Sequence, residues 1–476
     1  MLKKSLLLFL LFVVWGVPVF TQSQAASQST SADQKNVEVT VYNSNLALVK
    51  DQRDVNLAKG QGELRFMDVA AFIMPESVHV SSLNAGDQFN VLEQNYEYDL
   101  MDYGKLLSKY VGKDIKLLYD NPYQDRKDVV DAQLLSYNNN QPVYKIGDEI
   151  HLGYPGYQIL PQVPENLIAK PTLTWLYDNN FSDSNELEVS YLTTNLSWKA
   201  DYVLVLDQKD AAADLSGWVT VDNQSGAGYE NASLKLVAGD VNRVNTDVYQ
   251  YDMMEMKATA RGASAPQFEE KGFFEYHIYD LQRRTDLKNN QTKQISLLEA
   301  AGVNIKKEFI TNGNQDYYYS QYQGNDIKQA VEVTVRFDNK KENALGMPLP
   351  KGIVRLYKED EDKKLQFIGE DNIEHTPKDE EVKIRVGEAF DVVAQRKQTD
   401  FKQLTSRQSE SEWEITLRNH KEEDVTVKII EPVHGNWVVV SNSHPYKKED
   451  AFTLSFEVSV PKDQEVVVKY RVKIGY

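Results

Sequence analysis

Two carboxylates that follow an alternating apolar stretch are the strongest candidates for chemistry in this chain. The segment Gly387-Glu388-Ala389-Phe390-Asp391 places Glu388 and Asp391 three residues apart. Paired carboxylates that flank a substrate can hydrolyse a glycosidic bond by acid–base chemistry. The same segment is also typical of a strand end at which Asp391 caps the next element, and this interpretation is favoured. We therefore predict no catalytic residue and keep these two acids for the alternative of a hydrolase.

The other residues that could hold a metal or a cofactor lack the necessary spacing. The chain has seven histidines, and none is three to five residues from another, so no pair of zinc ligands on one helix is indicated. It has no cysteine, so a metal site with thiolate ligands is not indicated either. Asp178, Asn180, Asp183 and Asn185 could offer oxygen ligands to calcium, but the spacing favours a polar hairpin tip. Gly60-Gln61-Gly62 lacks the lysine of a phosphate-binding loop and favours a hairpin turn. We predict no metal and no cofactor.

A dense group of tyrosines is the best candidate for contact with a partner. Tyr317, Tyr318, Tyr319 and Tyr322 stand among Asn, Gln and Gly residues that favour a loop. Exposed tyrosines are good contact surfaces for protein or sugar. The alternative is that they pack against a sheet of their own domain. We keep this cluster as a candidate partner-binding site.

Alternating apolar and polar residues indicate that strands must position these groups. Four such runs follow one another near the carboxy terminus, beginning at Trp413, Val425, Phe452 and Val466. This period is typical of half-buried antiparallel strands. We predict an all-β protein of antiparallel β-sandwiches, with a small Ig-like sandwich at about residues 408–476. Helices are expected only at 101–111, capped by Asp102, and more weakly at 390–404.

The first residues predict export and a division into domains. Lys3 and Lys4 precede an apolar run from Leu6 to Phe20, and Ser23-Gln24-Ala25 offers a small-residue cleavage site. This layout predicts a signal peptide at 1–25 and a periplasmic or extracellular, soluble protein without a transmembrane helix in its mature chain. We expect a flexible linker at 26–36, a β-rich domain at 37–185, and a second β domain at 186–476 with an insertion at 240–272.

The net charge limits the partners that the chain can have. A formal net charge of −18 repels nucleic acid, so no nucleic-acid partner is predicted. Another envelope protein or a glycan remains as a partner, and the oligomeric state is left open. The last strand, which ends on Tyr476, also fits an outer-membrane barrel, but charged residues spread along most strands weigh against it.

Several motifs in the second half resemble a known family. They are Tyr191 to Tyr202, Leu215 to Trp218, Asn223 to Gly226, Leu345 to Gly352, Gly387 to Asp391, Asn419 to Lys421, and Trp437. In order and spacing these resemble the bacterial domain of unknown function 4139, the carboxy-terminal part of mucoidy-inhibitor-like proteins. The resemblance covers about residues 186–476. It implies a mostly β envelope or secreted protein, and it implies no established reaction.

Two functions therefore remain from different classes. The first is a non-catalytic binding or structural module of the bacterial cell envelope, favoured because no motif brings an acid, a base and a nucleophile together. The alternative is a carboxylate-dependent hydrolase of envelope polysaccharide or peptide.

Overall fold

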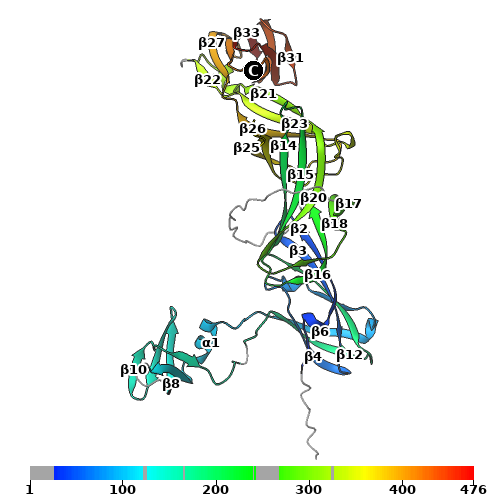
Figure 1. Cartoon of the computed structure of the whole chain (residues 1–476), viewed down its shortest axis with the longest axis vertical. Helices are drawn as coiled ribbons and strands as arrows, with labels where there is room; N and C mark the ends of the chain where they lie inside the picture. The colour runs from blue at the N-terminus through cyan, green and yellow to red at the C-terminus, as the bar shows by residue number, and fades with distance from the viewer. Residues whose placement is uncertain are drawn as a thin grey trace, which may run out of the picture. The chain divides into compact units, whose positions relative to one another are not determined.

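The computed structural model describes residues 26–121, 126–164, 167–239, 241–242, 267–322 and 326–475. In this part of the chain strands dominate, and α1 (Tyr103–Tyr110) is the only α-helix, which confirms the predicted all-β class (Figure 1). The described residues also contain the 3-10 helices η1 (Ser31–Asp33), η2 (Pro75–Ser77), η3 (Gly86–Gln88), η4 (Gln315–Tyr318) and η5 (Lys341–Asn343). The predicted signal peptide at 1–25 and most of the expected insertion at 240–272 lie outside the described residues.

The chain forms two compact units that are not continuous in sequence. The first unit contains the residues before 36, together with 51–71 and 79–189, and the second contains 36–50, 72–78 and 190–476. The strands β3 (Leu46–Val55) and β13 (Asn185–Thr193) carry the chain from one unit to the other. The domain boundary predicted at 185/186 thus falls at the start of a strand.

The first unit contains two sheets. One has the order β1-β4-β12-β6, with β1 (Ser27–Ser29), β4 (Gly60–Met67), β12 (Thr172–Asn179) and β6 (Phe89–Glu97). The other has the order β10-β9-β8-β7-β11, with β10 (Glu149–Leu152), β9 (Gln141–Ile146), β8 (Arg126–Asn138), β7 (Asp114–Asn121) and β11 (Tyr157–Ile159). The short β5 (His79–Ser82) also belongs to this unit.

The helix α1 lies where its capping residue predicts it. The Asp102 side chain accepts a hydrogen bond from the Lys105 amide at 2.8 Å, which satisfies one of the free donors of the first turn. Leu107 and Tyr110 are buried against the strands β7, β8 and β9. Gly112 has a φ of 81° and lies just after the helix, where glycine adopts the left-handed conformation most readily.

The second unit begins with a strand from the start of the chain. The strand β2 (Gln34–Tyr42) pairs in parallel with β16 (Tyr229–Ala238), from Glu38 against Ser233 to Tyr42 against Val237. The strand β16 pairs in turn with β18 (Tyr276–Leu281) and β19 (Thr285–Leu287), and β18 pairs with β17 (Phe268–Phe273). Val37, Val39 and Val41 of β2 are buried, as their alternation predicts.

Three further sheets complete the second unit. The first has the order β20-β15-β14-β24-β25, with β20 (Gln291–Asn304), β15 (Ala212–Asn223), β14 (Leu196–Leu206), β24 (Gly352–Glu359) and β25 (Leu365–Ile373). The second has the order β26-β23-β21-β29-β32-β31, with β26 (Glu381–Glu388), β23 (Glu332–Asp338), β21 (Lys306–Asn312), β29 (Val425–Pro432), β32 (Thr453–Val460) and β31 (Tyr446–Lys448). The third has the order β22-β27-β28-β33-β30, with β22 (Ile327–Gln329), β27 (Val392–Thr405), β28 (Gln408–Asn419), β33 (Gln464–Gly475) and β30 (Asn436–Asn442).

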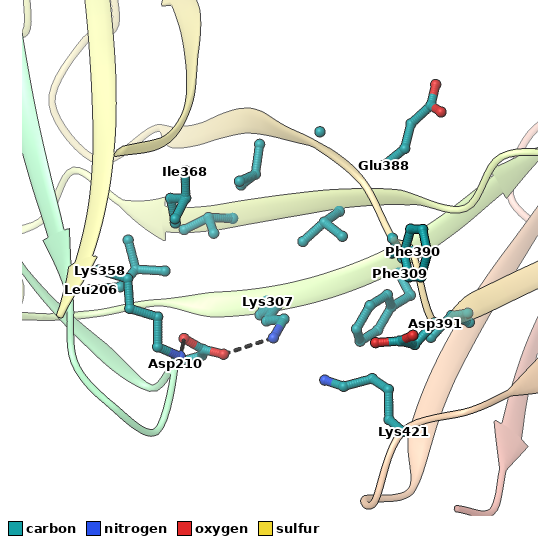
Figure 2. Close-up of a pocket in the computed structure, with 16 residues that line it drawn as sticks. Leu206, Asp210, Lys307, Phe309, Lys358, Ile368, Glu388, Phe390, Asp391 and Lys421 are labelled. Carbon is teal, nitrogen blue, oxygen red and sulfur yellow. Dashed lines mark hydrogen bonds and ion pairs between the residues drawn. The ribbon is translucent and has the colours of Figure 1, made fainter. Parts of the chain in front are cut away.

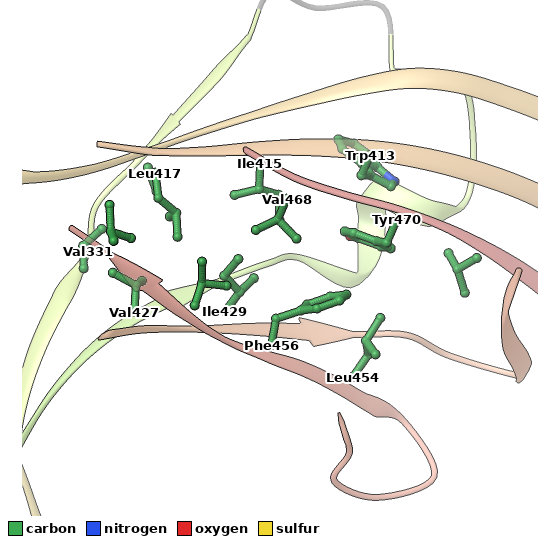
Figure 3. Packing of buried hydrophobic residues seen from close by; sticks show 14 of the residues in the cluster. Val331, Trp413, Ile415, Leu417, Val427, Ile429, Leu454, Phe456, Val468 and Tyr470 are labelled. Atoms are coloured by element: carbon green, nitrogen blue, oxygen red, sulfur yellow. The ribbon is translucent and has the colours of Figure 1, made fainter. Parts of the chain in front are cut away.

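The last two sheets share one apolar core and form a β-sandwich. Ile415 and Leu417 of β28 and Val468 of β33 pack with Ile429 of β29 and Phe456 of β32 (Figure 3). Each fully buried side chain of this kind contributes about 1.5–3 kcal/mol. The sandwich also takes strands from residues before 408, so it is larger than the segment expected at 408–476.

Three local predictions are wrong. Residues 26–36 are not an unstructured linker in the described chain, because they form β1, η1 and the start of β2. The weaker helix predicted at 390–404 is instead the strand β27, whose alternate residues Val392, Ala394 and Arg396 point into the core. Gly60 does not join a hairpin, because β3 and β4 belong to different sheets.

Candidate functional site

A pocket opens in the second unit beside the strands β25 and β26. These strands approach closely at Gly369, where an added Cβ would lie 2.1 Å from the Val386 carbonyl oxygen. The pocket has a volume of about 300 Å³ (Figure 2). Its wall is mainly aliphatic, from Leu206, Val333, Val335, Ile368, Val386 and Val392. Charged and aromatic residues complete it at both ends.

One end of the pocket is built around a shared carboxylate. The two oxygens of Asp210 each bind one ammonium group, that of Lys307 at 2.7 Å and that of Lys358. Asp210 lies in the turn after β14, where the Asp207 side chain accepts hydrogen bonds from two backbone amides of the same turn. Burial acts to raise the pKa of Asp210, but the hydrogen bonds from both lysines outweigh it and lower this pKa. The carboxyl therefore stays ionised and holds both lysines in place.

Two aromatic rings, those of Phe309 and Phe390, also line the pocket. The ammonium groups of Lys307 and Lys421 lie 5.4 and 5.5 Å from the centroid of the Phe309 ring, within the range of cation–π attraction. Phe390 also lines the pocket but is 94% exposed, the highest value among the large exposed hydrophobic residues of the described chain. A ring so exposed contributes almost no buried apolar area to the stability of the fold, which makes it a candidate for contact with a ligand.

A buried asparagine fixes the turn that carries Lys421. The Asn419 side chain accepts a hydrogen bond from the Lys421 amide at 3.0 Å and donates to the carbonyl oxygens of Glu423, Val460 and Pro461. Asn419 is 1% exposed. Asn419 thus positions Lys421 without reaching the pocket itself.

The two candidate acids both line this pocket but do not converge. Figure 2 shows the Asp391 carboxylate beside Phe309 and the Glu388 carboxylate pointing away from it. Glu388 lies 3.7 Å from Arg385 in an exposed ion pair. The Asp391 carbonyl accepts a hydrogen bond from the His420 amide at 2.7 Å, and the neighbouring Ala389 amide donates to Val331 at 2.8 Å. These two bonds fix the short link between β26 and β27.

The structure divides the predicted tyrosine site. Tyr318 lies in η4 and is 2% exposed, so it belongs to the sandwich core and not to a contact surface. The Tyr317 ring is half-buried and packs against Trp413, with 5.4 Å between ring centroids. Tyr319 and Tyr322 are 50% and 41% exposed and remain as surface candidates.

A buried polar network lies behind this tyrosine cluster. The Arg396 guanidinium contacts the Glu431 carboxylate at 2.6 Å, and both side chains are 0% exposed. The Tyr318 hydroxyl donates to Glu431 at 2.7 Å and lies 2.7 Å from the Tyr470 hydroxyl. Burial raises the pKa of both tyrosines well above the ordinary value, so they remain neutral. Because the network is closed to solvent, it supports the sandwich and offers no ligand site.

The described residues contain no group of three or more His, Asp or Glu side chains arranged to hold a metal ion. Asn180 and Asp183 lie between β12 and β13, which belong to different sheets, so this segment is not the hairpin tip that we expected. No helix in the described ranges is long and apolar enough to cross a membrane.

A family model matches residues 187–476, and its description is a domain of unknown function, DUF4139. The chain belongs to this family. No curated protein matches it. The pocket, the sandwich and Phe390 all lie inside the matched DUF4139 region.

Other motifs of the DUF4139 resemblance are scaffold. The Trp198 indole donates to the Val237 carbonyl at 3.2 Å, and the Tyr202 hydroxyl donates to the Pro350 carbonyl at 2.8 Å. Asn223 at the end of β15 repeats the arrangement of Asn419, since its side chain accepts from the Ser225 amide and donates to three carbonyl groups.

The strand-end asparagine is a signal that the sequence already contained. Asn179, Asn223, Asn339 and Asn419 are each buried at or just after the end of a strand, and each donates to carbonyl oxygens of the following loop. Each also accepts from an amide a few residues later. An asparagine after an alternating apolar run therefore marks a structured turn in this chain. The turn after Asn419 is the one that supplies a pocket lysine.

Proposed function

We propose that this chain is an exported protein of the bacterial cell envelope and that its DUF4139 domain binds a ligand in the pocket without catalysing a reaction. The observation that carries this proposal is Phe390, a ring that is 94% exposed at the pocket rim. Backbone hydrogen bonds on both sides hold the link that carries it. Because the link is already ordered, binding there costs little further conformational entropy.

The hydrolase remains the less supported alternative. General acid–base hydrolysis of a glycoside requires two carboxyl groups that face one bond, about 5–10 Å apart. Glu388 points away from the pocket, whereas Asp391 lies beside Phe309 (Figure 2). The third pocket acid, Asp210, is occupied by its two lysines. None of the three is placed as a free general base opposite a second acid.

Site-specific photocrosslinking in living cells tests the binding function. A photoreactive phenylalanine analogue replaces Phe390 in one variant and Phe274 in another, because Phe274 is 85% exposed in the same unit but is not part of the pocket. We expect a discrete covalent adduct from position 390 and none from position 274. Equal labelling at both positions would contradict a specific site.

A screen for activity separates the two functions. The purified protein is incubated with cell-wall glycans and peptides, with and without chelator. Turnover that disappears in Glu388→Ala or Asp391→Ala would establish the hydrolase and overturn our proposal. Amino-terminal sequencing of the mature protein tests export, since cleavage is expected near Ala25.

A further inference from the structure

We infer that a second copy of this chain pairs with the strand β30 and extends its sheet across the two molecules. This inference concerns one edge of the sandwich and goes beyond the proposed ligand binding, since no residue of β30 lines the pocket. Three observations support it. The strand β30 has a neighbouring strand on one side only, it carries no charge, and an exposed valine lies in the middle of its regular part.

The strand β30 has an open side. It ends the sheet of order β22-β27-β28-β33-β30. Among the described strands it pairs with β33 alone, from Asn436 against Gly475 to Asn442 against Tyr470. The backbone amide and carbonyl groups of β30 that point away from β33 therefore face no described strand. Such a row of backbone groups is a template for a further strand.

The other outer strands of the sandwich are protected, whereas β30 is not. The two sheets of the sandwich end at β26 and β31, and at β22 and β30. Basic residues stand on the first three of these strands, namely Lys383 and Arg385 on β26, Lys447 and Lys448 on β31, and Lys328 on β22. Lysines on outer strands prevent sheets from joining edge to edge. The sequence of β30, Asn-Trp-Val-Val-Val-Ser-Asn, has neither a charged residue nor a proline and lacks this protection.

The absence of charge on β30 favours a second copy as the occupant of its open side. Two copies of a chain with a net charge of −18 repel each other over most of their surfaces. In an antiparallel pair around a two-fold axis, a strand meets its own sequence, so a charged strand would place like charges opposite each other. The strand β30 meets only Asn, Trp, Val and Ser in this way, and no like-charge contact arises within the strand pair.

Val438 is the expected centre of the pair. The ladder between β30 and β33 is regular from Asn436 to Val439, and a bulge follows. Within this regular stretch Trp437 and Val439 pack against the sandwich core, while Val438 is 55% exposed. The Trp437 indole donates to the Ala451 carbonyl at 2.8 Å and fixes the strand before association. A pair centred on Val438 brings two β-branched side chains opposite each other, which stabilises antiparallel strands.

Sedimentation velocity of the full mature protein tests the association. We expect a monomer–dimer equilibrium between about 1 and about 100 μM, because a short strand pair makes a small interface. Val438→Lys should raise the dissociation constant at least about tenfold, since the two-fold axis places the two new charges opposite each other. Val129→Lys is the matched control, because Val129 is 54% exposed on β8 of the first unit. Its dissociation constant should equal that of the unchanged protein.

Single-cysteine variants locate the contact, because the chain has no cysteine of its own. Residues directly opposite in an antiparallel pair have Cβ atoms about 4.5–5.5 Å apart, which is close to the separation that a disulfide needs. Under mild oxidation Val438→Cys should give a covalent dimer, whereas Val129→Cys should remain monomeric. This measurement does not depend on whether Val438→Lys folds.

The outcomes separate this inference from the proposed function. A protein that stays monomeric over this range of concentration overturns the inference. A dimer that Val438→Lys leaves unchanged, and that Val438→Cys does not link, also overturns it, because the copies would then meet at another surface. A purified monomer whose Val438→Cys variant forms a disulfide with a different protein in cells assigns the edge to that protein and overturns the inference as well. Ligand binding is tested at position 390, so each of these results leaves the proposed function standing.

Discussion

Replacing Asn419 tests how the strand-end asparagines stabilise the sandwich. The side chain donates to the carbonyl oxygens of Glu423 at 2.8 Å, Val460 at 3.1 Å and Pro461 at 3.1 Å. It also accepts from the Lys421 amide at 3.0 Å. Asn419→Ala removes all of these bonds at a site that is 1% exposed.

The magnitude follows from these contacts. A buried hydrogen bond contributes about 1 kcal/mol net, and a buried carbonyl left without a donor costs about 1–3 kcal/mol. We therefore expect Asn419→Ala to lower the free energy of opening the sandwich by about 3 kcal/mol. Asn419→Asp should lower the free energy of opening the sandwich more than Asn419→Ala does, because a second oxygen would then face the three carbonyl groups.

Hydrogen exchange measures this loss locally, which suits a chain whose several sheets need not unfold together. Amides of β28 and β29 that exchange slowest should exchange about a hundredfold faster in Asn419→Ala, since about 1.4 kcal/mol is a factor of ten. Asn442→Ala is the control, because that exposed side chain makes one bond, to the His444 carbonyl at 2.8 Å. A change in Asn419→Ala no larger than in this control would refute the reasoning, as would an aspartate variant more stable than the alanine variant.

Three further changes have defined outcomes. Gly313→Ala should destabilise the sandwich by about 1–3 kcal/mol, because the new Cβ would lie 2.2 Å from a Glu431 oxygen; an unchanged urea midpoint would contradict this. Arg396→Met should cost about 3–5 kcal/mol by leaving Glu431 buried without its cation, and adding Glu431→Gln should recover part of the loss in the same urea titration. Asp210→Asn should lower the melting temperature at neutral pH, where the ionised carboxyl contributes fully. The pKa of Asp210 is lowered in the folded state, so this contribution is present above about pH 4 and is lost as the pH falls through the folded pKa. A difference in melting temperature between the unchanged protein and Asp210→Asn that does not become smaller in acid would contradict this prediction.

The alternation of side chains predicted the strands well, and its failures have physical causes. The segment 390–404 was predicted as a weaker helix but is the strand β27, in which Arg396 occupies a buried position of the alternating pattern. That arginine is buried only because Glu431, on another strand, supplies its counter-charge. The same carboxylate draws Tyr318 into the core and removes it from the predicted contact surface. Neither outcome is contained in the local sequence.

The candidate site could be predicted only in part. The segment Gly387 to Asp391 was singled out for its acids, and it does line the pocket, but its most informative residue is Phe390. Lys307, Lys358 and Lys421 come from three separate strands and turns, and no spacing connects them. Only the fold brings these ammonium groups together.

The parallel pairing of β2 with β16 has a consequence for anyone who isolates the DUF4139 region. The family match begins at residue 187, yet β2 comes from residues 34–42 and covers one edge of β16. A fragment of 187–476 would expose this edge of β16, and exposed strand edges template aggregation. A synthetic peptide of residues 34–45, added during refolding, should pair with the exposed edge of β16 and keep the fragment from aggregating. The region that the family model matches, residues 187–476, is therefore shorter than the part of the chain that forms this sheet, because β2 lies outside the match.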